Sequence, residues 1–286
     1  MRLATLNTPQ GPHPAVLVGD SYVDLVATAS TMPNSARELL ANPELMQKAA
    51  TISQRTDAVR VPKGSAKFHS PIHDPQKVIC VGLNYRDHAI ESKMAIPKEP
   101  VLFSKFPSAL IGHNEAIVVP KVSSKVDYEA ELVIVVGKRG RKIPESAAMD
   151  HVAGYSVGHD VSARDWQLEK DGKQWMVGKT FDTFAPVGPE LVTKDEVPDP
   201  HKLGIKLRLN GRTMQNSNTE QMIFTVAQLI AYVSIVFTLE PGDLIFTGTP
   251  PGIGHALNPP VYLRGGETTE VEIDGLGILR NPVVSE

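Results

Sequence analysis

The segment Asp127–Gly137, which reads DYEAELVIVVG, places the strongest constraint on how this chain can fold. Side chains alternate between the two faces of a strand, so Glu129 and Glu131 point the same way, about 6.6 Å apart along the chain. Leu132–Val136 is apolar on both faces, which is typical of a strand buried within a sheet. Two carboxylates at the mouth of such a strand repel each other and lose hydration, so they need a compensating positive charge.

A divalent metal ion is a suitable source of that charge, because Mg²⁺, Mn²⁺ and Ca²⁺ all prefer carboxylate oxygen. Asp160 ends a second apolar stretch, GYSVGHD, where the alternation gives way to a polar turn. The sequence therefore predicts a metal site made of Glu129, Glu131 and Asp160. The alternative is that the two glutamates lie on the solvated face of an edge strand and that Asp160 caps a turn.

From Lys77 onward the chain consists of short apolar or alternating runs separated by glycine and proline, a pattern typical of strands. The 23 prolines and 22 glycines favour a folded roll or barrel over a doubly wound sheet. We predict a mixed α/β fold dominated by strands, with a small N-terminal α/β domain at residues 1–70 and a β-roll catalytic domain at residues 71–286. The stretch PKGSAKFHSPIHDPQK between them is interpreted as a linker or crossing loop.

Few helices are expected. Ser35-x-x-Glu38 and Thr225-x-x-Gln228 are capping boxes, and each predicts the start of a helix. Further helices are predicted from about Arg86 to Lys93 and after Pro144.

The predicted helix from Arg86 carries His88 and Glu91, which lie on one helical face at positions i and i+3. A carboxylate bonded to one ring nitrogen makes the other nitrogen a better base, so the pair is a candidate for acid–base catalysis. Gly82 and Asn84, which precede the helix, suggest a mobile hinge. The alternative is a solvated helix face with an incidental contact between His88 and Glu91.

The turn that follows the predicted strand at 243–247 is rich in glycine and includes Gly248 and Thr249. Its free N–H groups and the Thr249 hydroxyl are predicted to hold a substrate carboxylate, although a plain tight turn would look the same. Arg164 is a further candidate for substrate binding. Lys179 is a lone lysine among apolar residues, either a surface side chain with a buried stem or a cation that offsets the carboxylates.

The overall composition excludes several classes of function. Apolar residues make up 41 % of the chain, and 29 basic against 32 acidic residues give a net charge of −3, so neither nucleic acid nor a membrane is expected as a partner. The single cysteine, Cys80, indicates a reducing compartment, and the N-terminal residues contain no signal or transit pattern. A cytoplasmic protein is expected.

Together these motifs resemble the fumarylacetoacetate hydrolase family, and most closely its branch of domain-containing protein 2. The resemblance extends from about residue 76 to 284 and is carried by VGLNYRDHAIE, FSKFPSALIG, DYEAELVIVVGKRGR, VAGYSVGHDVSARDWQ, GKTFDTFAPVGP and PGDLIFTGTPPGIG. It implies a β-roll that forms a homodimer and binds Mg²⁺, or Mn²⁺ or Ca²⁺, on Glu129, Glu131 and Asp160. It also implies a lid dyad of His88 and Glu91, a lysine beside the metal at Lys179, and a substrate-contacting threonine at Thr249.

The resemblance implies chemistry on a small 2-oxo acid. The main hypothesis is hydrolysis of a C–C bond or decarboxylation through an enolate, as in acylpyruvases, fumarylpyruvate hydrolases and oxaloacetate decarboxylases. The alternatives are keto–enol tautomerisation of oxaloacetate or a related isomerisation, a reaction like that of ureidoglycolate lyase, and a metal-binding module without catalysis. The N-terminal unit is shorter than that of fumarylacetoacetate hydrolase itself, which argues against that particular reaction.

Overall fold

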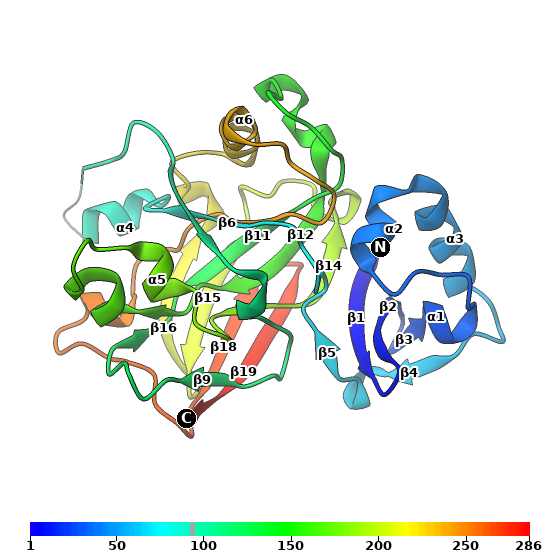
Figure 1. The fold of residues 1–286 in the computed structure, drawn as a ribbon, viewed down its shortest axis with the longest axis horizontal. Coiled ribbons are helices and arrows are strands. Elements are labelled where there is room, and N and C mark those ends of the chain that lie inside the picture. Colours follow the sequence, from blue (N-terminus) through cyan, green and yellow to red (C-terminus); the bar gives the residue numbers. More distant parts are fainter. Residues whose placement is uncertain (92–94) are drawn as a thin grey trace.

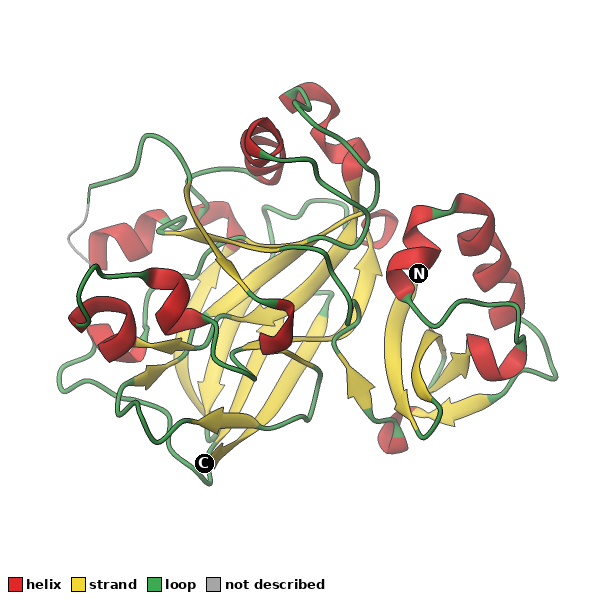
Figure 2. Cartoon of the chain, in the orientation of Figure 1, coloured by secondary structure: helices red, strands yellow, loops and turns green. Residues whose placement is uncertain are grey.

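The structure is a computed structural model that describes residues 1–91 and 95–286, with strands at its centre and helices on the outside (Figure 1, Figure 2). The strands are β1 Arg2–Thr8, β2 Gly11–Val18, β3 Ser21–Asp24, β4 Arg60–Pro62, β5 Phe68–His69, β6 Val78–Gly82, β7 Val101–Lys105, β8 Leu110–Ile111, β9 Ile117–Val119, β10 Val126–Asp127, β11 Ala130–Val136, β12 Val152–His159, β13 Ser162–Ala163, β14 Ala185–Thr193, β15 Gly204–Leu209, β16 Arg212–Asn218, β17 Leu244–Phe246, β18 Thr268–Ile273 and β19 Gly277–Ser285. The α-helices are α1 Leu25–Thr28, α2 Ala36–Ala41, α3 Pro43–Ser53, α4 Arg86–Glu91, α5 Trp175–Lys179 and α6 Val226–Val236. Short 3₁₀ turns lie at Lys63–Ser65, Pro107–Ala109, Glu145–His151, Lys194–Glu196, Thr219–Gln221 and Gly254–Ala256, and one π-helical turn lies at Asp165–Glu169.

A large mixed sheet forms the centre of the molecule, with the strand order β4-β3-β2-β1-β14-β12-β11-β17-β6-β7. The pair β11 and β12 is antiparallel, whereas β17 and β6 are parallel. Ala130 of β11 pairs with His159 of β12. Glu129 stands one residue before Ala130, and Asp160 stands one residue after His159. The two acids therefore meet at the same end of the sheet.

A second sheet of five strands, with the order β16-β15-β18-β19-β9, packs against the first and encloses the main core. Leu132 and Ile134 of β11 share one buried cluster with Leu207 of β15. Val133, on the opposite face of β11, belongs to a second cluster that includes Ile52 of α3. Because both faces of β11 are covered, its run of apolar residues is fully buried, and the predicted strand-dominated α/β fold is confirmed.

The N-terminal strands continue the large sheet, because β1 pairs antiparallel with β14 through Arg2 with Val192 and Leu3 with Leu191. In Figure 1 this unit, drawn in blue, carries α1, α2 and α3 beside its own strands. The division into domains at residue 70 stays a prediction, because hydrogen bonding between the strands is continuous across it.

Both capped helices form where they are predicted. Thr225 and Gln228 make the full reciprocal capping box of α6. Ser35 accepts from the Glu38 N–H at the start of α2. A 3₁₀ turn follows Pro144, and α4 begins at Arg86, while the predicted extension of α4 to residue 93 falls outside the described residues. No described helix in residues 1–91 and 95–286 has the length and apolar character needed to cross a membrane.

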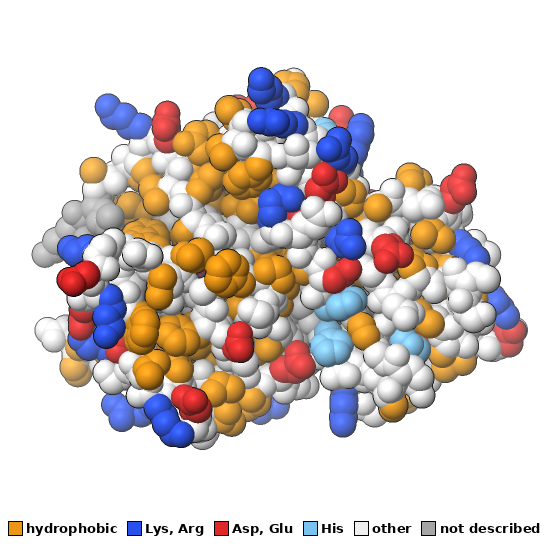
Figure 3. All heavy atoms as spheres, viewed as in Figure 1, with side chains coloured by type: hydrophobic (Ala, Val, Ile, Leu, Met, Phe, Trp, Pro, Cys, Tyr) orange, Lys and Arg blue, Asp and Glu red, His pale blue; other side chains and the backbone are white. Residues whose placement is uncertain are grey.

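Histidines gather where the N-terminal strands meet the rest of the chain (Figure 3). His113 is one of the histidines in this region: its ring contacts the Phe68 ring edge-on at 5.7 Å, and its Nδ1 accepts the Arg280 N–H at 3.1 Å. Burial, together with the Arg280 and Lys63 cations, lowers the pKa of His113 to about 4. The ring is therefore neutral at pH 7, as its acceptor role requires.

We expect acid to destabilise the fold through His113. Between pH 6.5 and 4 the unfolded chain binds a proton at this ring that the native chain does not. The contribution of His113 to the free energy of unfolding is therefore fully present above pH 6.5 and is lost as the pH falls towards 4. The loss is on the order of 2 kcal/mol once partial exposure is allowed for. Urea unfolding of the wild type and of His113→Asn, whose amide can accept without titrating, measures it. An identical pH dependence in the two proteins would contradict the assignment.

Candidate metal centre and active site

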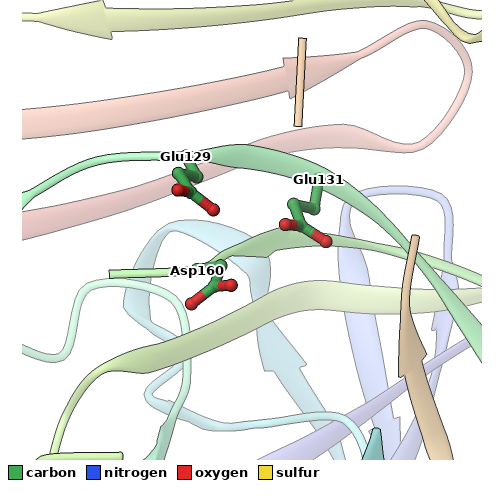
Figure 4. Close-up of side chains that lie close together, drawn as sticks. All are labelled: Glu129, Glu131 and Asp160. Atoms are coloured by element: carbon green, nitrogen blue, oxygen red, sulfur yellow. The ribbon is translucent and has the colours of Figure 1, made fainter. Parts of the chain in front are cut away.

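Three acidic side chains converge at one end of β11 and β12 (Figure 4). Glu129 precedes β11, Glu131 is its second residue, and Asp160 follows β12. One carboxylate oxygen from each lies within 4.8 Å of those from the other two. The side chains are buried, and Glu131 and Asp160 are only 1 % and 0 % exposed. The structure thus brings together the three residues that the sequence analysis assigns to a metal site.

Lys179, the last residue of α5, lies inside this cluster. Its ammonium is 2.9 Å from Glu129 and 2.8 Å from Asp160, and it donates to the Ser162 hydroxyl at 2.8 Å. Burial alone would lower the pKa of Lys179, but the Asp160 and Glu129 carboxylates raise it above the usual value. Of its two sequence interpretations, the surface side chain is wrong and the offsetting cation agrees with the structure.

A second lysine, Lys105 at the end of β7, approaches Asp160 from the other side. Its ammonium lies 2.7 Å from Asp160 Oδ1 and donates to the main-chain oxygens of Val161 and Phe184. Its side chain is fully buried. Burial lowers the pKa of Lys105 despite the neighbouring Asp160. Lys105 thus connects β7 to the turn after β12 and fixes the position of Asp160.

Arg164 occupies the third side of the cluster and bridges two acids. Its Nη2 donates to Glu129 at 2.6 Å, its Nε to Asp127 at 2.8 Å, and its Nη1 to the side-chain oxygen of Gln167 at 2.8 Å. Asp127 is fully buried. These three bonds hold the guanidinium in place, so Arg164 positions Glu129, while its predicted contact with substrate stays a prediction.

The charges of the cluster leave one carboxylate without a cation. Although burial would raise the pKa of Glu129, the Lys179 and Arg164 cations hold it well below its usual range. Burial, together with repulsion from Asp160 and Glu129, raises the pKa of Glu131 far above its usual value. Within residues 1–91 and 95–286, Glu131 has no ion-pair partner and accepts the Gly248 N–H at 2.7 Å. A buried carboxylate in this state, beside two others, fits a hard divalent cation that would restore its charge.

The predicted contact between His88 and Glu91 is present on α4. His88 Nδ1 lies 3.2 Å from Glu91 Oε2, and both Glu91 oxygens accept the Gly252 N–H, at 3.0 and 3.1 Å. His88 is 7 % exposed. The bond from Gly252 fixes the carboxylate, and the carboxylate in turn orients the ring, so that Nε2 is left to face a ligand.

Asn84 is an anchor and not the mobile hinge that the sequence suggests. It is fully buried, and its amide donates to the main-chain oxygens of Thr247 and Phe224. Its side-chain oxygen accepts the Phe224 N–H at 2.8 Å. These three hydrogen bonds hold the start of α4 against the end of β17 and against the segment that leads into α6.

Three N–H groups of the glycine-rich turn donate to the protein itself, although the sequence predicts that they are free to hold a substrate carboxylate. The amides of Gly248, Gly252 and Gly254 donate instead to Glu131, Glu91 and Asp127. Gly248 has φ +96°, a left-handed conformation that suits glycine and aims its N–H at Glu131. The turn therefore positions the acidic residues of the site.

Thr249 lies in the same turn, and its hydroxyl accepts the side-chain amide of Gln215 at 2.9 Å. Gln215 is fully buried, donates to the Pro250 carbonyl at 2.8 Å, and accepts the Ala130 N–H at 2.8 Å. One side chain of β16 thus holds the turn at a fixed distance from β11. Since the oxygen of Thr249 is occupied as an acceptor, its proton is available to a ligand in the cavity.

A cavity of about 220 Å³ lies over these groups. It is lined by Glu129, Glu131, Lys179, Arg164, His88, Thr249, His255 and Gln167 and, on the apolar side, by Val81, Gly82, Leu83, Phe103, Leu168, Trp175 and Ile253. His88, Thr249 and two of the three acids, Glu129 and Glu131, therefore face one space. Its size suits a small organic acid better than a polymer.

Lys105, Asp127 and Gln215 contribute to the site, but no role was predicted for them from the sequence. Asp127 stands two residues before Glu129 in the same acidic segment, which was an available signal. The other two appear in the sequence as ordinary polar residues of strands. Their importance depends on contacts with residues far away along the chain, which no local pattern reveals.

Comparison with known proteins places this site in a family. The model of the fumarylacetoacetate (FAA) hydrolase C-terminal domain matches residues 77–284. The chain is 47 % identical to a mitochondrial oxaloacetate tautomerase of Xenopus laevis and 46 % identical to one of Homo sapiens, over 99 % of this chain and 90 % and 92 % of theirs. The structure of a maleylpyruvate hydrolase from Sphingobium in complex with manganese(II) ion and pyruvate is 30 % identical, with a TM-score of 0.83 over 100 % of this chain and 99 % of that one.

The mitochondrial descriptions of these relatives contradict the expected cytoplasmic location, so that prediction was wrong. Its basis was a single cysteine and an unremarkable N-terminal composition, and neither feature distinguishes one reducing compartment from another. The fold, the acidic cluster and the similarity over nearly the whole chain lead to one conclusion. This chain belongs to the fumarylacetoacetate hydrolase family.

Proposed function

We propose that the protein is an oxaloacetate tautomerase, which interconverts the enol and keto forms of this four-carbon oxo diacid. The observation that carries the proposal is that His88, oriented by Glu91, lines the same cavity as Glu129 and Glu131. Tautomerisation needs a group that moves a proton and a site that stabilises negative charge on an oxygen, and it breaks no C–C bond. The relatives described as oxaloacetate tautomerases support this reading over hydrolysis or decarboxylation.

Glu129, Glu131 and Asp160 would hold the divalent ion, for which we propose Mg²⁺ or Mn²⁺. A bound ion supplies Lewis-acid stabilisation of the substrate's 2-oxo oxygen. Lys179 adds positive charge beside the same carboxylates and limits their repulsion. Thr249, whose oxygen is held by Gln215, donates its proton to the bound acid.

His88 carries the proton in this proposal. With Nδ1 donating to Glu91, Nε2 holds a lone pair and removes a proton from C3 of the keto form. The His88 imidazolium then delivers this proton to the 2-oxo oxygen as the C2–C3 double bond forms, so the net change is one proton moved from carbon to oxygen and the ring ends neutral. In the reverse reaction Nε2 removes the enol proton from this oxygen and the imidazolium returns it to C3. We also propose that the enzyme acts as a homodimer without nucleic acid or membrane partners.

A panel of substrates tests the proposal. With metal-loaded protein, enol oxaloacetate should lose its absorbance much faster than in buffer, with no matching formation of pyruvate, and acetylpyruvate and fumarylpyruvate should remain uncleaved. Stoichiometric pyruvate from oxaloacetate would identify a decarboxylase, and cleavage of an acylpyruvate would identify a hydrolase. Tight metal binding without turnover of any of them would favour a module without catalysis.

The packing of Trp175 on Gly82 gives a further prediction. A Cβ at Gly82 would lie 2.4 Å from the Trp175 ring, which lines the cavity and contacts Phe103 edge-on. Gly82→Ala should push the ring away and raise KM for oxaloacetate roughly tenfold, the low end of what one misplaced apolar group costs in a pocket. Gly64→Ala, where an added Cβ meets nothing within 4 Å, is the control. An unchanged KM in Gly82→Ala would show that the Trp175 wall does not contact substrate.

A further inference from the structure

His255 faces the cavity from its outer side, in the short turn Gly254–Ala256 that follows the glycine-rich segment. Its main-chain N–H donates to Asp127 Oδ2 at 3.0 Å, and its ring Nδ1 lies 2.9 Å from the Tyr262 hydroxyl. The side chain is thus fixed at both the backbone and the ring. His255 takes no part in the proton transfer proposed for His88.

Arg164 fixes where His255 lies relative to the acidic cluster. Asp127 Oδ2 accepts both the Arg164 Nε–H and the His255 N–H, while Arg164 Nη2 donates to Glu129. Asp127 and Arg164 therefore connect the backbone of His255 to Glu129, and His255, Arg164 and Glu129 line the same cavity. A ligand whose first carboxylate is at the acidic cluster would occupy the cavity that His255 also lines.

Both cationic side chains that line the described cavity are held by hydrogen bonds within the protein. Lys179 donates to Glu129, Asp160 and Ser162. Arg164 donates to Asp127, Glu129 and Gln167. Of the polar side chains that line the cavity in the described structure, His255 alone is partly exposed, whereas the others are buried.

We propose that His255 binds the C4 carboxylate of oxaloacetate and thereby selects four-carbon oxo diacids over oxo monoacids. The inference rests on the proposed function, which supplies a substrate with a second carboxylate. We assign the Tyr262 hydroxyl, 2.9 Å from Nδ1, as the donor of this hydrogen bond, so that the ring proton lies on Nε2 and Nε2 is a hydrogen-bond donor. Burial, together with the Arg164 cation, lowers the pKa of His255, so the ring is neutral at pH 7 and binds the carboxylate by this single donor.

Binding of two stable analogues tests the assignment without turnover. L-Malate and (S)-2-hydroxybutyrate share the carboxylate and hydroxyl of the metal-binding end and differ only in a C4 carboxylate against a methyl group. Calorimetry on Mn²⁺-loaded protein should show that the wild type prefers malate. In His255→Leu the Kd of malate should rise roughly tenfold, the usual value of one hydrogen bond to a charged group, with that of 2-hydroxybutyrate within twofold of wild type.

Further variants separate binding from a structural role. His255→Gln retains a donor and should restore part of the preference, and Tyr262→Phe should weaken malate binding alone. His151→Leu, at an exposed turn where the ring bonds the Lys138 carbonyl, is the control. In steady-state assays His255→Leu should raise KM for oxaloacetate and leave kcat nearly unchanged.

Three results would overturn the inference: equal affinity of the wild type for both analogues, preference for malate retained in His255→Leu, or equal weakening of both ligands. Its failure is distinguishable from that of the proposed function. A wild type that prefers malate through His255 but does not accelerate enol loss would retain the diacid site and refute the tautomerase.

Discussion

Glu131→Gln is expected to abolish both metal binding and oxaloacetate tautomerisation while leaving the protein folded. Glu131 is the one carboxylate of the cluster without a cation among the described residues, and burial and repulsion raise its pKa. A bound divalent ion would supply the positive charge that this carboxylate lacks. Metal affinity should fall by more than about 100-fold, since even residues that only support a ligand cost 10–100-fold when lost. Activity should fall by on the order of 10³ or more.

The same change should not destabilise the metal-free protein. Glutamine has nearly the volume of glutamate, keeps an oxygen for the Gly248 N–H, and removes the repulsion from Asp160 and Glu129. Thermal unfolding in EDTA should give a Tm at or above that of the wild type. Glu272→Gln, whose surface carboxylate pairs with Arg208, is the matched control for metal affinity. Wild-type affinity for Mn²⁺ in Glu131→Gln would refute the assignment of this ligand.

His88→Ala is expected to lower kcat by about 10²–10⁴-fold, the usual contribution of a positioned general base, and to leave metal affinity unchanged. The ring is hydrogen-bonded to Glu91, and within the described structure no hydrogen bond or ion pair joins it to the metal ligands. The rate of enol loss and the Mn²⁺ affinity, measured on one preparation, separate the two effects.

Glu91→Gln is the graded variant for this prediction. Glutamine still accepts the Gly252 N–H but no longer stabilises a protonated imidazole, so its loss of kcat should be smaller than that of His88→Ala. If His88→Ala instead retains wild-type kcat, the proton is carried by another group. Parallel loss of metal affinity would mean that His88 supports the cluster and does not act as the base.

The parts of the fold that local patterns determine could be predicted from the sequence. The buried strand β11 follows from the alternation of Glu129 and Glu131 and the apolar run after them, and α6 follows from its capping box. The continuation of the large sheet from β14 into β1 could not be predicted, because it joins residues nearly 190 positions apart. No property of either strand alone specifies that pairing.

The same distinction holds for the site. The register of β11 with β12 places Glu129 beside Asp160, so the acids could be found by assuming one strand pair. Lys105 and Gln215 could not, because their partners come from several segments that are distant along the chain. The glycine-rich turn shows most clearly what the sequence could not predict. The sequence predicts N–H groups that are free for a substrate, whereas the N–H groups of Gly248, Gly252 and Gly254 donate to the protein's own carboxylates.

The central claim is that oxaloacetate tautomerisation depends on a divalent ion held by Glu129, Glu131 and Asp160. The most direct measurement is the rate of enol loss by wild-type protein that has been stripped with EDTA, dialysed, and then titrated with Mn²⁺. The rate should fall to that of buffer after stripping and rise in proportion to bound metal, saturating at one ion per chain. Full activity in the stripped protein, or metal uptake without recovery of the rate, would contradict the account.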